Sequence, residues 1–153
     1  MPNAWLNVPH YKQEYHYSCV AACARMVLAH LGSQRTEAEL REQLGTKESG
    51  TRVGNLTSLE TWGIDVSLRE SNLSQLRDAV ALDTPVMVFL ETGPLDYWTL
   101  DVAHVVVVVG MDVNTAYVND PFFDTAPTPV PLSQFELAWA KTGQFAAFVR
   151  RCS

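Results

Sequence analysis

Cys19 is the residue whose type and position point most directly to chemistry. It stands at the start of a predicted helix, where the partial positive charge of the helix end favours the thiolate, the nucleophilic form of cysteine. Cys23 follows one turn later among alanines and is expected to be buried and inert, whereas Cys152 in the tail is expected to be exposed. A cysteine beside an apolar segment is more often structural than nucleophilic, so Cys19 needs a neighbouring base to react.

His104 is the candidate for that base. It directly precedes a run of five valines, residues 105–109, which predicts a strand. An imidazole titrates near neutral pH, so it can accept a proton and return it to a leaving group. A rigid strand would hold the ring firmly, as a catalytic base requires. The alternative is a hydrogen-bonded surface histidine at the end of a strand.

Asp120 and Gln13 could complete such a site. A hairpin turning near residues 112–114 would bring Asp120 to about the level of His104, where its carboxylate could orient the imidazole. The alternative for Asp120, which Pro121 follows, is that it only ends the strand. Gln13 lies six residues before Cys19 and could donate a hydrogen bond to an oxyanion, together with the Cys19 backbone N–H. Surface glutamines are common, so Gln13 carries little weight alone.

Other site chemistries fit the sequence less well. Cys19, Cys23 and His104 could in principle bind zinc, but their spacing is rare among zinc sites, and no Cys-x-x-Cys or His-x-x-x-His pair occurs. There is no Gly-x-Ser-x-Gly motif for a serine nucleophile and no phosphate-binding loop. We therefore expect neither a metal nor a cofactor.

Composition sets broad limits on the class of protein. The chain has 153 residues, 47% of them hydrophobic, and a net charge of −6 without any basic cluster, which argues against nucleic acid or an anionic membrane as a partner. Its longest apolar block is far shorter than the roughly 20 residues that span a bilayer. The first residues lack a secretory signal and the cysteine count is odd, which favours a reducing, cytoplasmic compartment. We expect one domain over residues 1–153.

The elements that must position these residues change type along the chain. The first part predicts helices: one from the Ser18 cap to Gly32, a second opened by a capping box at residues 36–39 and closed by Gly45, and a short third before Gly63. The later part predicts strands at residues 66–68, 86–90, 105–109, 116–119 and 145–149, with helices at 74–82 and after a capping box at 133–136. This order predicts an α+β domain in which helices pack on an antiparallel sheet.

Two long loops carry aromatic residues. Tyr97 and Trp98 lie in the loop 91–101, and Phe122 and Phe123 lie in the loop 120–131. Long structured loops in a small domain are often functional, so these four rings are candidates for lining a substrate cleft. Alternatively, they cap the ends of the core.

Together these segments resemble the papain-like double-glycine leader peptidases, the cysteine peptidase domains best known from bacteriocin-exporting ABC transporters. The resemblance rests on residues 8–13 with 18–28, on the histidine strand 103–112, and on the Val-Asn-Asp-Pro segment 118–121. Residues 135–139 are similar to the C-terminal helix of the family. The resemblance covers roughly residues 8–150 in the family's order.

The resemblance implies a papain-like fold in which Cys19 is the nucleophile, His104 the general base and acid, Asp120 its orienter and Gln13 an oxyanion donor. It implies hydrolysis of a peptide or isopeptide bond in a peptide or protein substrate, and the family alone suggests glycine before the scissile bond. Ser18 and Val20 replace the aspartate and glycine usual in the family, and Val20 would reshape the substrate groove. We expect a standalone domain without a transporter. Acyl transfer by the same thiol and a non-catalytic peptide-binding module remain alternatives, and the oligomeric state is not indicated.

Overall fold

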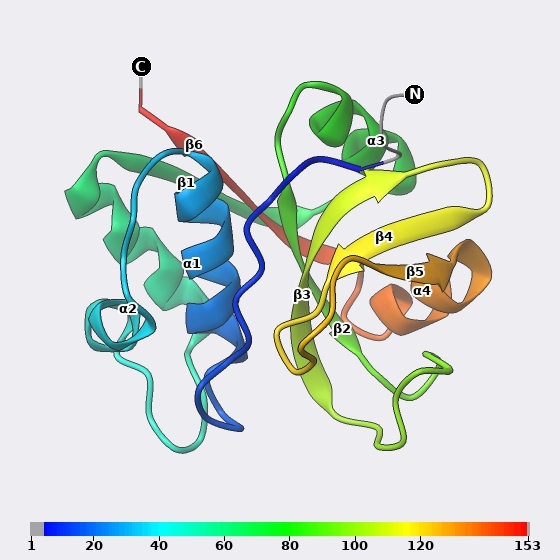
Figure 1. The fold of residues 1–153 in the computed structure, drawn as a ribbon, viewed down its shortest axis with the longest axis horizontal. Helices are drawn as coiled ribbons and strands as arrows, with labels where there is room; N and C mark the ends of the chain where they lie inside the picture. The colour runs from blue at the N-terminus through cyan, green and yellow to red at the C-terminus, as the bar shows by residue number, and fades with distance from the viewer. Residues whose placement is uncertain (1–4, 153) are drawn as a thin grey trace.

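The computed structural model describes residues 5–152 (Figure 1). The prediction about a secretory signal rests mainly on residues 1–4, which lie outside the described residues. In chain order the elements are α1 (Cys19–His30), α2 (Glu37–Leu44), the 3-10 helix η1 (Val53–Trp62), β1 (Ile64–Glu70), α3 (Leu73–Ala81), β2 (Val86–Glu91), β3 (Ala103–Met111), β4 (Thr115–Asn119), β5 (Thr128–Pro131), α4 (Leu132–Ala140) and β6 (Phe145–Arg151). Among the described residues, no helix is both long and apolar enough to cross a membrane.

A six-stranded sheet organises the fold. Its order is β1-β6-β2-β3-β4-β5, and every neighbouring pair is antiparallel. The valines of β3 alternate between two buried layers: Val105, Val107 and Val109 belong to the layer with α1, α2 and η1, and Val106 and Val108 to the layer with α3 and α4. Figure 1 shows α1 and α2 beside the sheet and α3 and α4 away from them. The predicted α+β class is confirmed, and β3 is a continuous apolar run because both of its faces are covered.

The helices before the sheet form where local signals predict them. The α2 helix has its capping box, in which Thr36 accepts from the Glu39 N–H and Glu39 accepts from the Thr36 N–H, and it ends at Gly45 with φ +64°. The left-handed backbone at Gly45 is one that glycine adopts without steric cost. The helix predicted before Gly63 is confirmed in place, although it is a 3-10 helix.

The hairpin of β3 and β4 forms as predicted, but its register corrects one expectation. Asn119 pairs with Val107, and an irregularity follows between Val108 and Gly110. Continued by one residue, this register sets Asp120 opposite Val106, so Asp120 and His104 are not level. The offset arises because the turn connects the paired residues Met111 and Ala116 and is therefore centred between residues 113 and 114, beyond residue 112; the irregularity itself moves Asp120 one position back toward His104. The Asp120 side chain therefore reaches His104 diagonally.

Two further expectations were wrong. The helix predicted to begin with a Ser133 cap starts at Leu132, so Ser133 lies within its first turn. The segment just before it, expected to be loop, forms the short strand β5, which pairs with β4 at the edge of the sheet. Pro129 and Pro131 obscured this strand in the sequence, because proline lacks the N–H that a central strand needs and is tolerated only at edges.

Candidate active site

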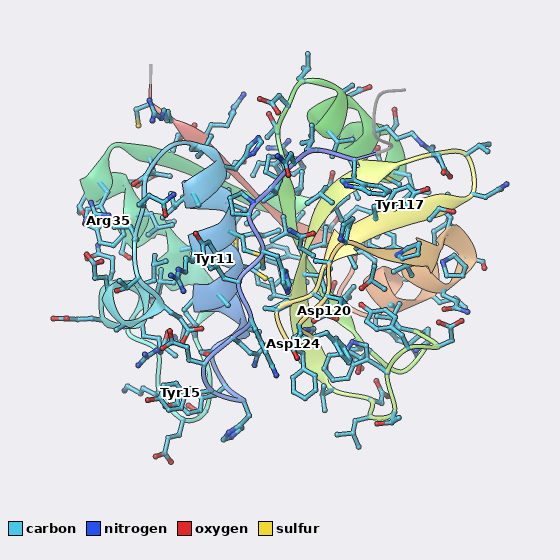
Figure 2. The ribbon with its side chains drawn as sticks, viewed as in Figure 1. Tyr11, Tyr15, Arg35, Tyr117, Asp120 and Asp124 are labelled. Carbon is cyan, nitrogen blue, oxygen red and sulfur yellow. The ribbon has the colours of Figure 1, made fainter. Side chains whose placement is uncertain are left out.

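Three of the residues singled out by type and spacing come together at one place. His104 donates from Nε2 to Asp120 Oδ1 across 2.7 Å. Cys19, the first residue of α1, lines the same cavity of about 400 Å³ as His104. Cys23 holds α1 against β3 by donating from Sγ to the Val105 carbonyl oxygen (3.4 Å), next to His104. In Figure 2, Asp120 lies near the middle of the molecule, on the side of the strands. The packing of α1 on β3 thus places the thiol beside the imidazole.

His104 is buried, and its surroundings favour the imidazolium. Burial acts to lower the pKa of His104, but the hydrogen bond to Asp120 and the contact with Cys19 outweigh it and raise the pKa to about 9. Because His104 Nε2 is hydrogen-bonded to Asp120, Nδ1 is the ring nitrogen that remains to exchange a proton with the Cys19 thiol. This is the arrangement of a base that a carboxylate holds in one orientation.

Asp120 is fully buried and accepts four hydrogen bonds. Its Oδ1 accepts from His104 Nε2 and from the Phe122 N–H (3.0 Å), and its Oδ2 accepts from Tyr97 Oη (2.7 Å) and Trp98 Nε1 (2.9 Å). Burial acts to raise the pKa of Asp120, but the hydrogen bond and charge of His104, with the other donors, lower it below its ordinary value. The site therefore stabilises a carboxylate without contact to water.

The four aromatic residues proposed for substrate binding lie around the His104–Asp120 pair. The Trp98 ring meets the His104 ring edge to face at 4.8 Å and packs on Phe122 (4.7 Å), and Phe123 packs on both Tyr97 and Trp98 (5.4 Å each). Among the described residues that line the cavity, none of the four occurs. Burial and the Asp120 charge raise the pKa of Tyr97 well above its ordinary value, so its hydroxyl remains a donor. No spacing of residues in the sequence predicted that the Tyr97 hydroxyl donates to Asp120.

The structure places Gln13 close to the Asp120 loop but not in the cavity wall. Its backbone N–H donates to the Pro121 carbonyl oxygen (2.7 Å), and its side-chain Nε2 donates to the Tyr15 carbonyl oxygen (2.8 Å). Its Oε1 is buried and has no hydrogen-bond partner among the described residues. An amide nitrogen carries two protons, so the second remains for another acceptor.

Ser18 occupies the position before α1 without capping it through its side chain. Its hydroxyl instead contacts Glu37 Oε1 (3.2 Å), which also accepts from the Glu14 N–H (3.0 Å). Glu37 is 1% exposed, and Arg41 Nε donates to its other oxygen (3.0 Å). This buried carboxylate ties α2 to the loop that leads into Cys19. Sequence reasoning missed it, because glutamate in the first turn of a helix is ordinarily a solvated residue.

The burial of Cys23 and the exposure of Cys152 match their predictions. Cys23 is completely buried, and burial, followed by the negative charges of Cys19 and Asp120, raises the pKa of its thiol well above the ordinary value. Cys152 is exposed. Across the part of the chain that the structure describes, no group of three or more histidine, cysteine or acidic side chains could hold a metal ion. Cys23 donates to a backbone oxygen instead.

Comparisons with known proteins identify the family. Residues 5–147 match the Peptidase_C39 like family. A protein of Methanothermobacter thermautotrophicus is 33% identical over 110 residues, which cover 71% of this chain and 68% of that protein.

Solved structures share the fold. A Bacillus anthracis protein named for its likeness to C39 peptidases has a TM-score of 0.78 at 20% identity. The match covers 99% of this chain and 100% of that protein's chain. The peptidase domain of Streptococcus ComA has a TM-score of 0.76 at 23% identity and covers 97% of this chain and 99% of its own. A double glycine motif protease from a PCAT transporter, solved with the leader peptide, has a TM-score of 0.74 at 19% identity. The match covers 97% of this chain and 95% of that chain. The fold is papain-like, and the chain belongs to the C39-like peptidase family.

Proposed function

We propose that this protein is a cysteine peptidase that hydrolyses a peptide or isopeptide bond with Cys19 as nucleophile. One observation carries the proposal: the His104 imidazole lies between the buried Asp120 carboxylate and the cavity that Cys19 lines. Membership of a peptidase family supports the same reaction class. A thiol, a base and a carboxylate in this order make up the catalytic unit of thiol hydrolases.

In the first half of the reaction, the Cys19 thiolate attacks the substrate carbonyl carbon and forms a C–S bond. The backbone N–H of Cys19 stabilises the resulting oxyanion, because the first N–H groups of a helix have no acceptor within it. The free amide proton of Gln13 is the second donor. The His104 imidazolium then gives its proton to the amide nitrogen, the C–N bond breaks, and the amine leaves a thioester on Cys19.

In the second half, water attacks the thioester while His104 takes one of its protons. The C–S bond breaks, the carboxylic acid leaves, and the thiolate–imidazolium pair is restored. Asp120 holds the ring in one orientation and stabilises its positive charge throughout, because its carboxylate stays ionised and hydrogen-bonded.

The comparisons support a class of substrate. The PCAT protease was solved with a leader peptide, which supports a peptide or protein substrate for this chain as well. Cleavage after glycine is the corresponding expectation. All three cysteines are free thiols, which suits a reducing compartment, so we place the activity of this single domain, residues 1–153, in the cytoplasm.

Selective alkylation tests the nucleophile. At pH 7, we expect iodoacetamide to modify Cys19 much faster than Cys23, because Cys19 borders a cavity beside an imidazolium whereas Cys23 is buried. The measurement is site-resolved mass spectrometry of the folded protein over time. His104→Ala should slow the reaction of Cys19, because the neighbouring positive charge is lost.

The exposed Cys152 serves as an internal reference for an ordinary thiol in the same sample. Equal labelling of Cys19 and Cys23, or no labelling of either, would exclude the catalytic proposal and favour a non-catalytic binding module of the same fold.

The pH profile tests the charge on His104. Because the pKa of His104 is raised to about 9, the imidazolium persists below that pH and is lost as the pH rises through it. We therefore expect kcat/KM for a peptide substrate to fall on the alkaline side with a midpoint near pH 9. Asp120→Asn should move this midpoint to lower pH, because burial then acts on the ring without the opposing carboxylate. An alkaline midpoint that Asp120→Asn leaves unchanged would mean that another group titrates there.

A further inference from the structure

The loop that leads into α1 carries both groups of the proposed oxyanion site, the Gln13 amide and the Cys19 N–H, and it rests on Glu37 of α2. Glu37 is 1% exposed, and the reaction proposed above gives its carboxylate no role. Burial of a carboxylate is costly unless hydrogen bonds and a positive charge replace the water that it loses. The partners of this carboxylate therefore indicate what it does.

Both oxygens of Glu37 are hydrogen-bonded. Oε1 accepts from the Glu14 N–H (3.0 Å) and lies 3.2 Å from the Ser18 hydroxyl oxygen, and Oε2 accepts from Arg41 Nε (3.0 Å). Arg41 also donates from its Nη2 to Glu14 Oε1 (3.0 Å), so the guanidinium has a second acidic partner. The carboxylate thus has a cation on one side and the loop before Cys19 on the other.

The Ser18 hydroxyl proton has two acceptors within reach, of which the Tyr15 carbonyl oxygen (2.9 Å) is already occupied. That oxygen accepts from the Ser18 N–H (3.1 Å) and from Gln13 Nε2 (2.8 Å), which uses both of its lone pairs. The Ser18 proton is left for Glu37 Oε1, while the Ser18 oxygen accepts from the Tyr15 N–H (3.0 Å). Glu37 thereby holds the turn 15–18 and, through Tyr15, the Gln13 amide.

The contacts of Glu37 lie at both ends of the segment between the two oxyanion donors. Glu14 directly follows Gln13, and Ser18 directly precedes Cys19. One carboxylate oxygen therefore joins the two residues adjacent to the donors and fixes the distance between them. Donors stabilise an oxyanion best when they are held in place before the reaction, because they then need no rearrangement as the charge develops.

We propose that Glu37 is a positioning residue for the oxyanion site, whose carboxylate sets the Gln13 amide and the Cys19 N–H at the spacing that a tetrahedral intermediate needs. The inference rests on the proposed peptidase function and adds to it a residue that does not touch the substrate. It predicts that loss of the carboxylate slows reactions that pass through an oxyanion at Cys19. Reactions of the same thiol that form no oxyanion should be spared.

Two reactions of Cys19 make this distinction. In the hydrolysis of acetyl-Gly-Gly p-nitrophenyl ester, the thiolate attacks the carbonyl carbon, p-nitrophenolate leaves, and water then cleaves the thioester and releases the acid. Negative charge develops on the carbonyl oxygen in both steps. In alkylation by iodoacetamide, a C–S bond forms as iodide leaves, and no oxyanion arises. Absorbance follows the first reaction and site-resolved mass spectrometry the second. Cys19→Ala gives the background rate, which includes attack by the exposed Cys152.

Glu37→Gln keeps the size of the side chain but cannot satisfy the same donors. Whichever way its amide is turned, the NH₂ group faces either Arg41 Nε or the Glu14 N–H. We expect kcat/KM for the ester to fall by about 10- to 100-fold, because small displacements of positioned groups have effects of this size. The rate of alkylation should stay within about threefold of wild type. Glu42→Ala is the matched control, since Glu42 is an exposed acid of the same helix, and it should change neither rate.

The outcomes separate this proposal from the peptidase function. A loss confined to the ester reaction supports the positioning role. Equal losses in both reactions would show that Glu37 only maintains the fold, and no loss in either would show that the loop keeps its shape without the carboxylate; both results overturn the proposal. If circular dichroism shows that Glu37→Gln does not fold, Ser18→Ala carries the same test with the same outcomes, because it breaks the link to Glu37 without leaving a charge unpaired. A wild type with no ester hydrolysis above Cys19→Ala contradicts the peptidase proposal itself.

Discussion

Cys19→Ala is expected to lower the hydrolysis of a peptide substrate by about 10⁴-fold or more, because no other thiol can form the acyl-enzyme. The structure explains why Cys23 cannot replace it: that thiol is completely buried, its pKa is raised, and its Sγ donates to the Val105 carbonyl oxygen. The fold should survive, since Cys19 begins a helix whose buried residues lie further along. The measurement is kcat/KM together with circular dichroism.

Cys23→Ala is the matched control, because it makes the same chemical change one turn along the same helix. It removes a buried sulfur and a weak hydrogen bond, so it should cost some stability but leave kcat/KM within about threefold of wild type. Loss of hydrolysis in Cys23→Ala with full retention in Cys19→Ala would reverse the assignment of the nucleophile.

Asp120→Ala is expected to damage both activity and stability. It removes the acceptor of four buried or partly buried donors, namely His104 Nε2, Tyr97 Oη, Trp98 Nε1 and the Phe122 N–H. Removing one partner of a buried ion pair costs about 3–5 kcal/mol, because the remaining charge is left unpaired. We also expect kcat/KM to fall by between about 10²- and 10⁴-fold, since the imidazole loses its orientation. Chemical denaturation and steady-state kinetics measure the two effects separately.

Two variants separate orientation from general destabilisation. Asp124→Ala removes an exposed acid from the same loop and should change stability by less than about 0.5 kcal/mol. Tyr97→Phe leaves Asp120 with three of its four donors, so it should lower the free energy of unfolding by about 1.5–3 kcal/mol. It should shift the alkaline limb of the pH profile less than Asp120→Asn does. Activity of folded Asp120→Ala within tenfold of wild type would show that Asp120 has a structural role only.

Local patterns in the sequence predicted much of this fold. The capping box before α2, the glycine after it and the valine run of β3 each depend on neighbouring residues, so their signals remain in the chain order. The same holds for the approach of Asp120 to His104, which a short hairpin ensures. Strand β5 escaped prediction because its prolines contradict local strand propensity and only its place at the sheet edge permits them.

The sequence by itself thus determined the fold class and the candidate set of Cys19, His104 and Asp120. Only the tertiary structure decided what surrounds them. It made Tyr97 and Trp98 donors to Asp120, linked Glu37 to the loop before Cys19, and formed a cavity between η1 and the strands. These contacts join segments that are distant in the chain. They depend on how whole elements pack against one another, a property that no local spacing of residue types encodes.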